Sequence, residues 1–206
     1  MNFLSFQSVF QSYPVIPTYE IAKRFPGYSS DVLTRWQKNG YLRKLRNGYY
    51  RLETAAVEDE SSLYRIANTL YSPSYVSLQS ALHHYNFIPE GVFQISSVST
   101  RTNRKFSTGL GTYVYRNLQP RLYFGFSFER FGDQVYKMAS PEKAVLDFLY
   151  LHPQYNSAED MEELRWNTLE IRELFDKVRA DDYAQYIDSQ ALRRRYELFC
   201  THLENS

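Results

Sequence analysis

The pair Asn47-Gly48 is the feature of this sequence that most restricts how the chain can fold. It stands between residues 41–45 and 49–52, two short segments in which apolar and basic side chains are interleaved. Asn-Gly in this setting is the strongest short-range signal for a β-hairpin, because a tight turn needs positive φ at its centre and glycine adopts positive φ without steric cost. The sequence therefore predicts a hairpin over residues 41–52.

Three short helices are predicted ahead of this hairpin. Apolar residues recur at helical spacing in each segment, serine or threonine stands near two of the expected starts, and proline or glycine follows each expected end. Three helices followed by a hairpin is the order of a winged helix-turn-helix, so we expect residues 1–55 to form such a domain. The predicted helices span 3–13, 20–25 with Thr18 as N-cap, and 31–39 with Ser29 and Ser30 as candidate caps.

Residues 56–206 predict a second, larger domain of mixed α/β type, joined to the first by a linker within the acidic stretch 53–61. Aromatic and alternating segments separated by Gly, Asn or Asp indicate an antiparallel sheet. Ser140-Pro141-Glu142 is a strong helix start, because it combines an N-cap, a first-position proline and an acid in the first turn. The expected fold class is α+β, with a helical tail over about 157–206. The predicted strands span 92–100, 111–116, 122–129 and 134–138, and the predicted helices before the tail begin near 63, 77 and 140.

Positive charge is concentrated in the first quarter of the chain. Residues 1–51 carry eight lysines and arginines against two acids, a formal charge of +6, whereas residues 52–206 carry sixteen bases against twenty-one acids. The overall charge of +1 is therefore a sum over two parts of opposite sign. This asymmetry suggests two modules with different partners, although basic residues also serve as plain solvated surface.

Hydropathy and cysteine content argue against a membrane-spanning, a secreted or a disulfide-bonded protein. Apolar runs are too short and too often interrupted to span a bilayer, and the N-terminus lacks the basic start and apolar stretch of a signal peptide. Cys200 is the only cysteine, which excludes an intrachain disulfide and a multi-cysteine zinc site. We therefore expect a cytoplasmic protein with no membrane partner, no metal and no cofactor.

A winged helix-turn-helix would place its third helix in the major groove of DNA and its hairpin against the backbone or the minor groove. Arginine reads base edges, while threonine and lysine more often hold phosphates. The alternative from another class is a protein-interaction module whose basic N-terminal domain docks an acidic partner. The predicted DNA contacts are Ser30, Thr34, Arg35 and Lys38 on the helix, and Arg43, Lys44, Arg46 and Asn47 on the hairpin.

Four stretches also carry a family resemblance. LTRWQKNGYLRKLRNGYYRL is similar to the N-terminal winged-helix domain of the AbiEi antitoxin family, from type IV toxin–antitoxin (abortive infection) systems. YVSLQSALHHYNFIPE resembles the family's Tyr-x-Ser-x-x-Ser-Ala-Leu helix and the Ile-Pro-Glu after it, and ISSVSTRTNRKF with GTYVYRNL resembles its paired strands. KMASPEKAVLDFLYL resembles its Ala-x-Pro-Glu-Lys-Ala-Leu-Leu-Asp block, with Val145 in place of the first Leu. The matches span about residues 20–152.

The resemblance implies two activities for one chain. The N-terminal domain would bind operator DNA in its own promoter, at inverted repeats, and so act as the repressor of a bacterial operon. The larger domain would counteract a nucleotidyltransferase-like toxin without needing a stable complex with it. The resemblance therefore implies a transcriptional regulator that is also an antitoxin.

Catalysis is the weaker alternative. Glu142, Lys143 and Asp147 are reminiscent of the acid–lysine sets of nucleic-acid-processing enzymes, but Glu142 and Lys143 are adjacent at a helix start rather than alternating on a strand. The simpler interpretation is that Glu142 interacts with the helix dipole while Lys143 or Asp147 makes a local polar contact. Cys200 in the helical tail is better explained as a buried structural thiol. We expect no enzymatic activity.

A second basic segment lies at residues 99–107, where Arg101, Arg104 and Lys105 are predicted to occupy a polar turn between strands. An ordinary solvated turn is the simpler interpretation. The alternative is a second anion contact, to DNA, to tRNA or to a nucleotide associated with a toxin.

Overall fold

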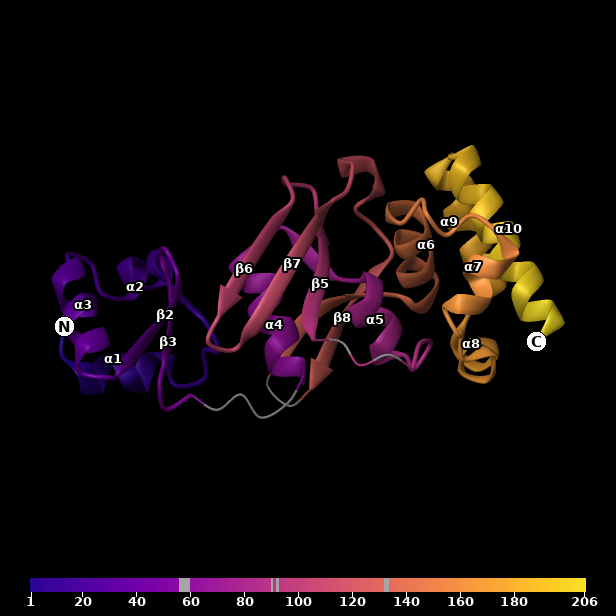
Figure 1. The fold of residues 1–206 in the computed structure, drawn as a ribbon. Helices are drawn as coiled ribbons and strands as arrows, with labels where there is room; N and C mark the ends of the chain where they lie inside the picture. The colour runs from indigo at the N-terminus through magenta and orange to yellow at the C-terminus, as the bar shows by residue number, and fades with distance from the viewer. Residues whose placement is uncertain (56–59, 90, 92, 132–133) are drawn as a thin grey trace.

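The computed structural model describes residues 1–55, 60–89, 91, 93–131 and 134–206, and it shows an α+β protein with two sheets (Figure 1). A small N-terminal module lies at one end of the molecule, a six-stranded sheet in the middle and the C-terminal helices at the other end. The predicted fold class is therefore confirmed. Within the described ranges, no helix combines the length and apolar character needed to cross a membrane.

The N-terminal module has the order helix, strand, helix, helix, strand, strand. Its three strands form an antiparallel sheet in the order β1-β3-β2. The apolar residues spaced along its helices, among them Phe6, Phe10, Leu33 and Trp36, are buried in one cluster with the inner residues of the strands. The elements are α1 (Phe3–Phe10), β1 (Ile16–Pro17), α2 (Thr18–Arg24), α3 (Ser30–Lys38), β2 (Leu42–Arg46) and β3 (Tyr49–Leu52).

The predicted hairpin is present, with Asn47-Gly48 as the two residues between paired Arg46 and Tyr49. Gly48 has φ +80°, so glycine supplies the positive φ of this turn. The register shifts between Lys44 and Arg46, a bulge that changes which face the following side chains take. One predicted cap is wrong: Thr18 is the first residue of α2 rather than its N-cap, because Pro17 occupies the cap position.

The second module is built on a six-stranded sheet in the order β6-β7-β5-β4-β9-β8. The sheet is mixed rather than antiparallel as predicted, because β5 pairs with β7 and β4 pairs with β9 in parallel. The predicted strand 92–100 begins at Val92, and the stretch 75–90 that resembles the family ends at Glu90. Both of these terminal residues lie outside the described part of the chain. The strands are β4 (Ser74–Val76), β5 (Gln94–Ser99), β6 (Arg104–Thr108), β7 (Gly111–Asn117), β8 (Phe126–Phe131) and β9 (Gln134–Ala139).

Strand β6 was not predicted, since its residues were expected to form a polar turn. It is an edge strand that pairs only with β7 among the described strands, from Arg104 opposite Tyr115 to Thr108 opposite Gly111. Charged residues are common on edge strands, because they discourage pairing with another chain, and here they hide the strand pattern. The true turn is residues 100–103.

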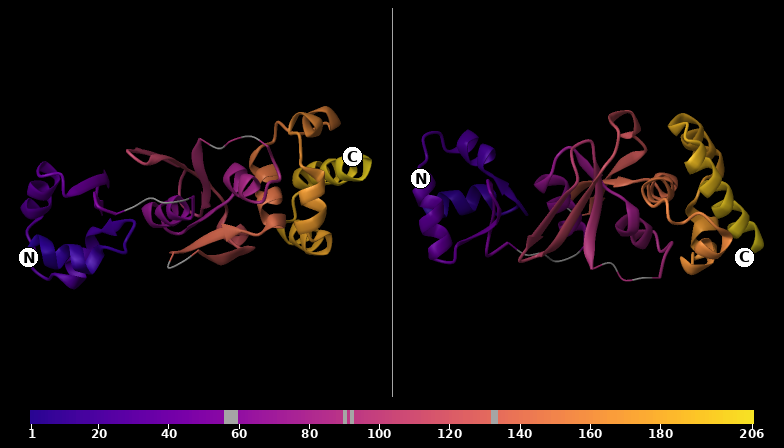
Figure 2. Two further views of the ribbon diagram at one scale, coloured as in Figure 1. Left: turned by 90° about the horizontal axis from the view of Figure 1, so that it is seen from below. Right: turned by 45° about the horizontal axis from the view of Figure 1, so that its top comes forward.

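Helices cover the sheet and extend the molecule away from the N-terminal module (Figure 2). Helices α4 and α5 pack on the strands, and α6 lies between the sheet and the tail helices α9 and α10. Ser140 caps α6 as predicted, by accepting a hydrogen bond from the Lys143 amide at 3.3 Å. The helices are α4 (Glu60–Leu70), α5 (Leu78–His84), α6 (Pro141–Leu151), α7 (Ala158–Glu163), α8 (Thr168–Leu174), α9 (Lys177–Ile187) and α10 (Gln190–Asn205), with a 3-10 turn at Pro120–Leu122.

The two modules have separate apolar cores that meet at the hairpin. Val15, just before β1, and Leu45 on β2 belong to the N-terminal module, yet they are buried in the cluster of the second module. Strands β2 and β6 are in contact there. The linker predicted over 53–61 falls partly on residues 56–59, which lie outside the described residues.

Candidate nucleic-acid interface

Helix α3 is anchored by its inner face and presents an exposed polar face. Leu33 and Trp36 are 2% and 4% exposed and hold the helix on the core of the N-terminal module. Ser29 is its N-cap and accepts a hydrogen bond from the Asp31 amide at 3.2 Å, and Gly40 follows its end with φ +72°. These local contacts fix which side of the helix faces solvent.

The four predicted contacts on α3 are all exposed. Ser30, Thr34 and Lys38 follow one another at spacings of four residues, and Arg35 stands three residues before Lys38, so i,i+3 and i,i+4 relations join the four along one exposed side of the helix. None of the described residues forms a recorded hydrogen bond or ion pair with the side chains of Thr34, Arg35 and Lys38. This row is free to meet an anionic partner.

The four predicted contacts on the hairpin divide into two pairs. Lys44 and Asn47 are exposed. Arg43 is exposed but engaged, because its Nε lies 2.8 Å from Glu53 Oε1 and its Nη1 lies close to Gly109, 2.8 Å from the position that a Cβ would take there. The hydrogen bond from Arg43 to Glu53 raises the pKa of the guanidinium.

Arg46 is directed toward the second module. Its guanidinium carbon lies 3.8 Å from the centre of the Tyr49 ring and 4.9 Å from that of Phe106 on β6. Such cation–π contacts attract a guanidinium to the faces of aromatic rings and so favour one position for it. The structure therefore places Arg46 at the junction of the modules.

Arg51, one of the eight basic residues in the first quarter of the chain, is buried. It is 4% exposed and donates hydrogen bonds to the carbonyl oxygens of Leu52 and Ala55. Burial lowers the pKa of its guanidinium, and the nearby charge of Arg43 adds to this effect. The basic charge of the first quarter thus serves in part to hold the end of β3 in place.

The second basic segment is also divided. Arg101 and Arg104 line one hollow together with Arg46. Lys105 lines a different hollow, with Gln94 and Thr112. Successive residues of a strand point to opposite faces of the sheet, which explains why Arg104 and Lys105 line different hollows. The structure brings three of the predicted basic residues together and separates the fourth.

Lys143 and Asp147 form a buried cluster that sequence reasoning described only as a local contact. Their side chains are 0% and 2% exposed and form an ion pair one helical turn apart on α6. Tyr75 donates a hydrogen bond to Asp147 Oδ2 at 2.8 Å and accepts one from Lys143 Nζ at 3.0 Å. Ser77 donates to the same carboxylate oxygen at 2.9 Å. Since the amine does not reach solvent, this arrangement fits a structural role.

Glu142, beside this cluster, is 1% exposed and links α6 to the tail. Its Oε1 accepts a hydrogen bond from the Asp176 amide at 3.0 Å, and its Oε2 lies 3.7 Å from Arg179 Nη1. The carboxylate lies in the first turn of α6, as expected of an acid near the helix dipole. The contact with the start of α9 was not predicted.

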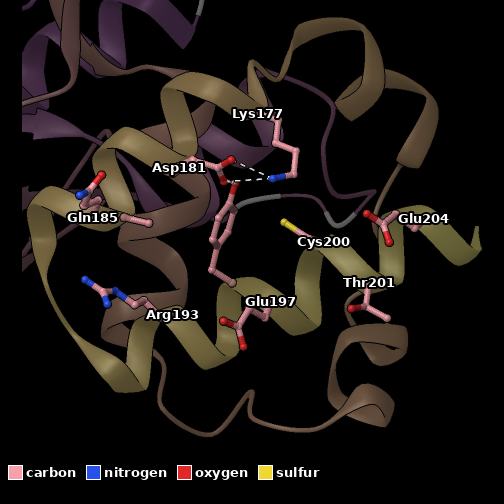
Figure 3. Close-up of a pocket in the computed structure, with 10 residues that line it drawn as sticks. Lys177, Asp181, Gln185, Arg193, Glu197, Cys200, Thr201 and Glu204 are labelled. Atoms are coloured by element: carbon pink, nitrogen blue, oxygen red, sulfur yellow. Dashed lines mark hydrogen bonds and ion pairs between the residues drawn. The ribbon is translucent and has the colours of Figure 1, made fainter.

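A hollow of about 390 Å³ lies between α9 and α10 (Figure 3). Lys177 pairs with Asp181 at 2.8 Å, and Tyr196 donates to the same carboxylate at 2.9 Å. Cys200 lines this hollow and is half-buried, and burial raises the pKa of its thiol. A raised thiol pKa disfavours the reactive thiolate. Across the described part of the chain, no three His, Cys, Asp or Glu residues gather in a way that could hold a metal.

Comparison with known proteins identifies no relative in which this site could be compared. No family model matches the chain, and no curated protein matches it.

Proposed function

We propose that this chain is a DNA-binding transcriptional regulator of winged helix-turn-helix type that acts in the cytoplasm on the promoter of its own operon. The observation that carries the proposal is the exposed row on α3. Ser30, Thr34, Arg35 and Lys38 share a face of a helix whose opposite face is fixed by Leu33 and Trp36.

Helix α3 is the element we assign to the major groove. A recognition helix contacts base edges mainly through its exposed residues, while flanking residues contact phosphates. Arg35 has the geometry to bond two acceptors of one guanine, and Lys38 and Thr34 suit phosphate oxygens. Ser30, the first residue of α3, would add hydroxyl and backbone N–H contacts to phosphate at the helix N-terminus.

The hairpin contributes less to DNA binding than its charge suggests. Lys44 and Asn47 are exposed and are our candidates for backbone contact. Arg43 and Arg46 are held by Glu53 and by the rings of Tyr49 and Phe106. We therefore assign Arg46 to the junction of the modules and not to DNA.

The test is equilibrium binding of the full chain to its own promoter DNA, followed by fluorescence anisotropy over a series of salt concentrations. Binding should weaken steeply with salt, because Lys and Arg displace counterions from the phosphates. Arg35→Ala should weaken binding by about 1–3 kcal/mol and relax base preference, whereas Lys38→Ala should weaken binding to all sequences alike.

Arg194→Ala is the matched control, because it removes one exposed positive charge from α10 at the far end of the molecule. It should leave the affinity for DNA unchanged. The proposal fails if the full chain binds no DNA at low salt, or if the control weakens binding as much as Lys38→Ala does.

We further propose that the larger module makes the chain an antitoxin against a nucleotidyltransferase-like toxin, as the resemblance to the AbiEi family implies. The support is the resemblance of residues 75–90 and 137–151 to family motifs, whose Tyr75, Lys143 and Asp147 meet in one buried cluster. A nucleotidyltransferase-like gene beside this one would supply the toxin for the test.

The two proposed roles can be tested separately. The double variant Arg35→Ala/Lys38→Ala should lose operator binding but still rescue the growth of cells that express the toxin. Continued growth arrest with a folded chain would contradict the antitoxin assignment and leave the DNA-binding assignment to its own test.

A further inference from the structure

A hollow of about 590 Å³ lies where the hairpin of the N-terminal module meets the edge of the central sheet. Arg46 lines it from β2, Arg101 from the turn after β5, and Arg104 from β6. Three guanidinium groups from separate elements thus converge on one concave surface.

Arg46 lines this hollow and has a donor that no described residue satisfies. Its Nε is buried and has no hydrogen-bond partner among the described residues. A buried donor without a partner is costly, and in a folded protein it calls for a ligand or water. The rings of Tyr49 and Phe106 hold the guanidinium in position, so the donor is preorganised.

Arg101 is also held in place, but most of its N–H donors remain unused. Its Nη1 donates to the Ser72 carbonyl oxygen at 3.2 Å, and its guanidinium carbon lies 4.6 Å from the centre of the Tyr71 ring. A guanidinium has five N–H donors, so this anchoring leaves several available. Arg104 extends from the exposed edge strand with no recorded ion pair to a described residue.

The three positive charges are not compensated within the hollow. None of the described residues that line it is acidic, and the remaining polar groups come from Thr100, Thr102 and Asn117. Like charges gathered at a partly buried site repel one another, and a polyanion would relieve that repulsion.

We propose that this junction hollow binds the chained phosphoryl groups of a nucleoside triphosphate. Guanidinium groups match phosphate oxygens with paired hydrogen bonds, and three of them suit a ligand with several phosphoryl groups. A planar guanidinium can stack on the base of the nucleoside, and the polar side chains that line the hollow can bond to its edge. A free ligand fits the concave junction better than a duplex does, because Arg46 is only partly exposed and is held against the rings of Tyr49 and Phe106. The ligand would bridge β2 of one module and β6 of the other. This site does not depend on the proposed binding of DNA by α3.

The test is isothermal titration calorimetry of the full chain at low salt with ATP, with GTP and with inorganic triphosphate. One ligand per chain should bind. Arg104→Gln should weaken that binding about tenfold or more, because it removes a charge-assisted contact. Arg101→Gln should act in the same direction. Lys105→Gln is the matched control, since it removes the same charge from the neighbouring residue of β6 on the other face, and it should change the affinity by less than about twofold.

Each outcome decides the proposal. Equal affinity for the three ligands supports recognition through phosphoryl groups, and a preference for ATP or GTP supports it with an added nucleoside contact. Absence of binding by all three overturns it. An equal loss in Arg104→Gln and Lys105→Gln overturns it too, because binding would then follow diffuse charge.

A parallel titration with duplex DNA of unrelated sequence separates the source of the phosphates. If Arg104→Gln weakens DNA binding while no triphosphate binds, the hollow takes the nucleic-acid backbone and the proposal is overturned. If Arg35→Ala abolishes operator binding while triphosphate binding is intact, the junction site and the α3 interface are independent, as proposed.

Discussion

Lys143 and Asp147 lie one helical turn apart on α6, and neither side chain is accessible to solvent. A buried ion pair is tolerated only when its remaining hydrogen-bonding capacity is satisfied. Tyr75 on β4 and Ser77, the residue before α5, do this by donating hydrogen bonds to the Asp147 carboxylate. Burial raises the pKa of the Tyr75 phenol, and the Asp147 carboxylate adds to the rise, so the phenol stays protonated and donates to Asp147. The cluster therefore ties α6 to the sheet.

Lys143→Met should destabilise the protein by about 3–5 kcal/mol, because it leaves the Asp147 carboxylate buried without its cation. Urea unfolding followed by circular dichroism measures the change. Lys177→Met is the matched control, since Lys177 and Asp181 form the same i,i+4 pair on α9 with side chains 61% and 49% exposed. The control should cost less than about 1 kcal/mol. Equal losses would mean that the α6 pair is hydrated in solution.

His152 makes the stability of the fold sensitive to mild acid. Its ring stacks on that of Phe148 with centroids 4.5 Å apart, and its Nδ1 lies 2.9 Å from the Phe148 carbonyl oxygen. Burial lowers the pKa of His152 below its usual value, and Arg116 adds to that effect while the contact with the Phe148 carbonyl opposes it.

The sign of the effect follows from this lowered pKa. Above about pH 6.5 the imidazole is neutral in both the folded and the unfolded chain, so its titration does not change stability there. As the pH falls below that value, the unfolded chain takes up the proton first and the free energy of unfolding decreases. Between about pH 7.5 and about pH 5.5 the melting temperature of the parent should therefore fall more than that of His152→Gln. An identical fall in both proteins would contradict the prediction.

At the scale of elements, the hairpin shows how one residue sets a local shape. Gly48 has φ +80°, and its carbonyl oxygen accepts a hydrogen bond from the Thr18 amide at 2.8 Å. The turn therefore joins the hairpin to the start of α2. A residue with a Cβ is strained at this φ even where space is available.

Gly48→Ala should destabilise the N-terminal module by about 1–2 kcal/mol, because alanine resists positive φ. The protein has two tryptophans, and Trp36 lies in the core of this module. Urea unfolding followed by the fluorescence of Trp36, in a Trp166→Phe background, isolates the effect. Gly91→Ala is the control, since Gly91 lies outside the positive-φ range and a Cβ there meets open space. A loss in the control as large as that in Gly48→Ala would show that strain at the turn is not the cause.

Local signals explain which elements could be predicted from the sequence. The helix caps, the Asn-Gly pair and the Ser-Pro-Glu start each act within a few residues, and the elements that they predict are present. The exposed row on α3 followed from helical spacing alone. Strand β6 was missed because Arg104 and Lys105 give a charged edge strand the composition of a turn. The parallel pairings of β5 with β7 and β4 with β9 depend on contacts between distant segments, which no local pattern encodes.

The same reasoning explains which parts of the site could not be predicted. Arg46 was expected to contact DNA because it stands beside the hairpin turn, but its ring partner Phe106 comes from the other module. The bulge between Lys44 and Arg46 changes which face of the sheet the Arg46 side chain takes, and the alternation of residues in the sequence does not predict it. Lys143 was expected to make only a local polar contact, whereas its contact with Tyr75 on β4 comes from a distant segment of the chain.

At the scale of the whole molecule, the hairpin belongs to both modules. Leu42 is buried in the N-terminal core, whereas Leu45, three residues later on the same strand, is buried in the core of the second module. Across the same junction, Arg43 lies close to Gly109 and Arg46 makes a cation–π contact with Phe106. An interface that includes buried apolar residues limits the relative motion of two modules.

Leu45→Ala and Leu42→Ala form a matched pair that measures this coupling. Native-state hydrogen exchange of the slowest amides of β5 and β7 reports the opening of the second module. Leu45→Ala should lower that opening free energy by up to about 2–5 kcal/mol, because it removes apolar contacts from the second core. Leu42→Ala removes the same side chain from the other core, so it should leave the exchange of β5 and β7 unchanged while it destabilises α1 and α3. If both variants leave β5 and β7 unchanged, the modules move independently in solution. A ligand that bridges Arg46 and Arg104 would then have to create the junction on binding, and its affinity would be reduced by the free energy of ordering two modules.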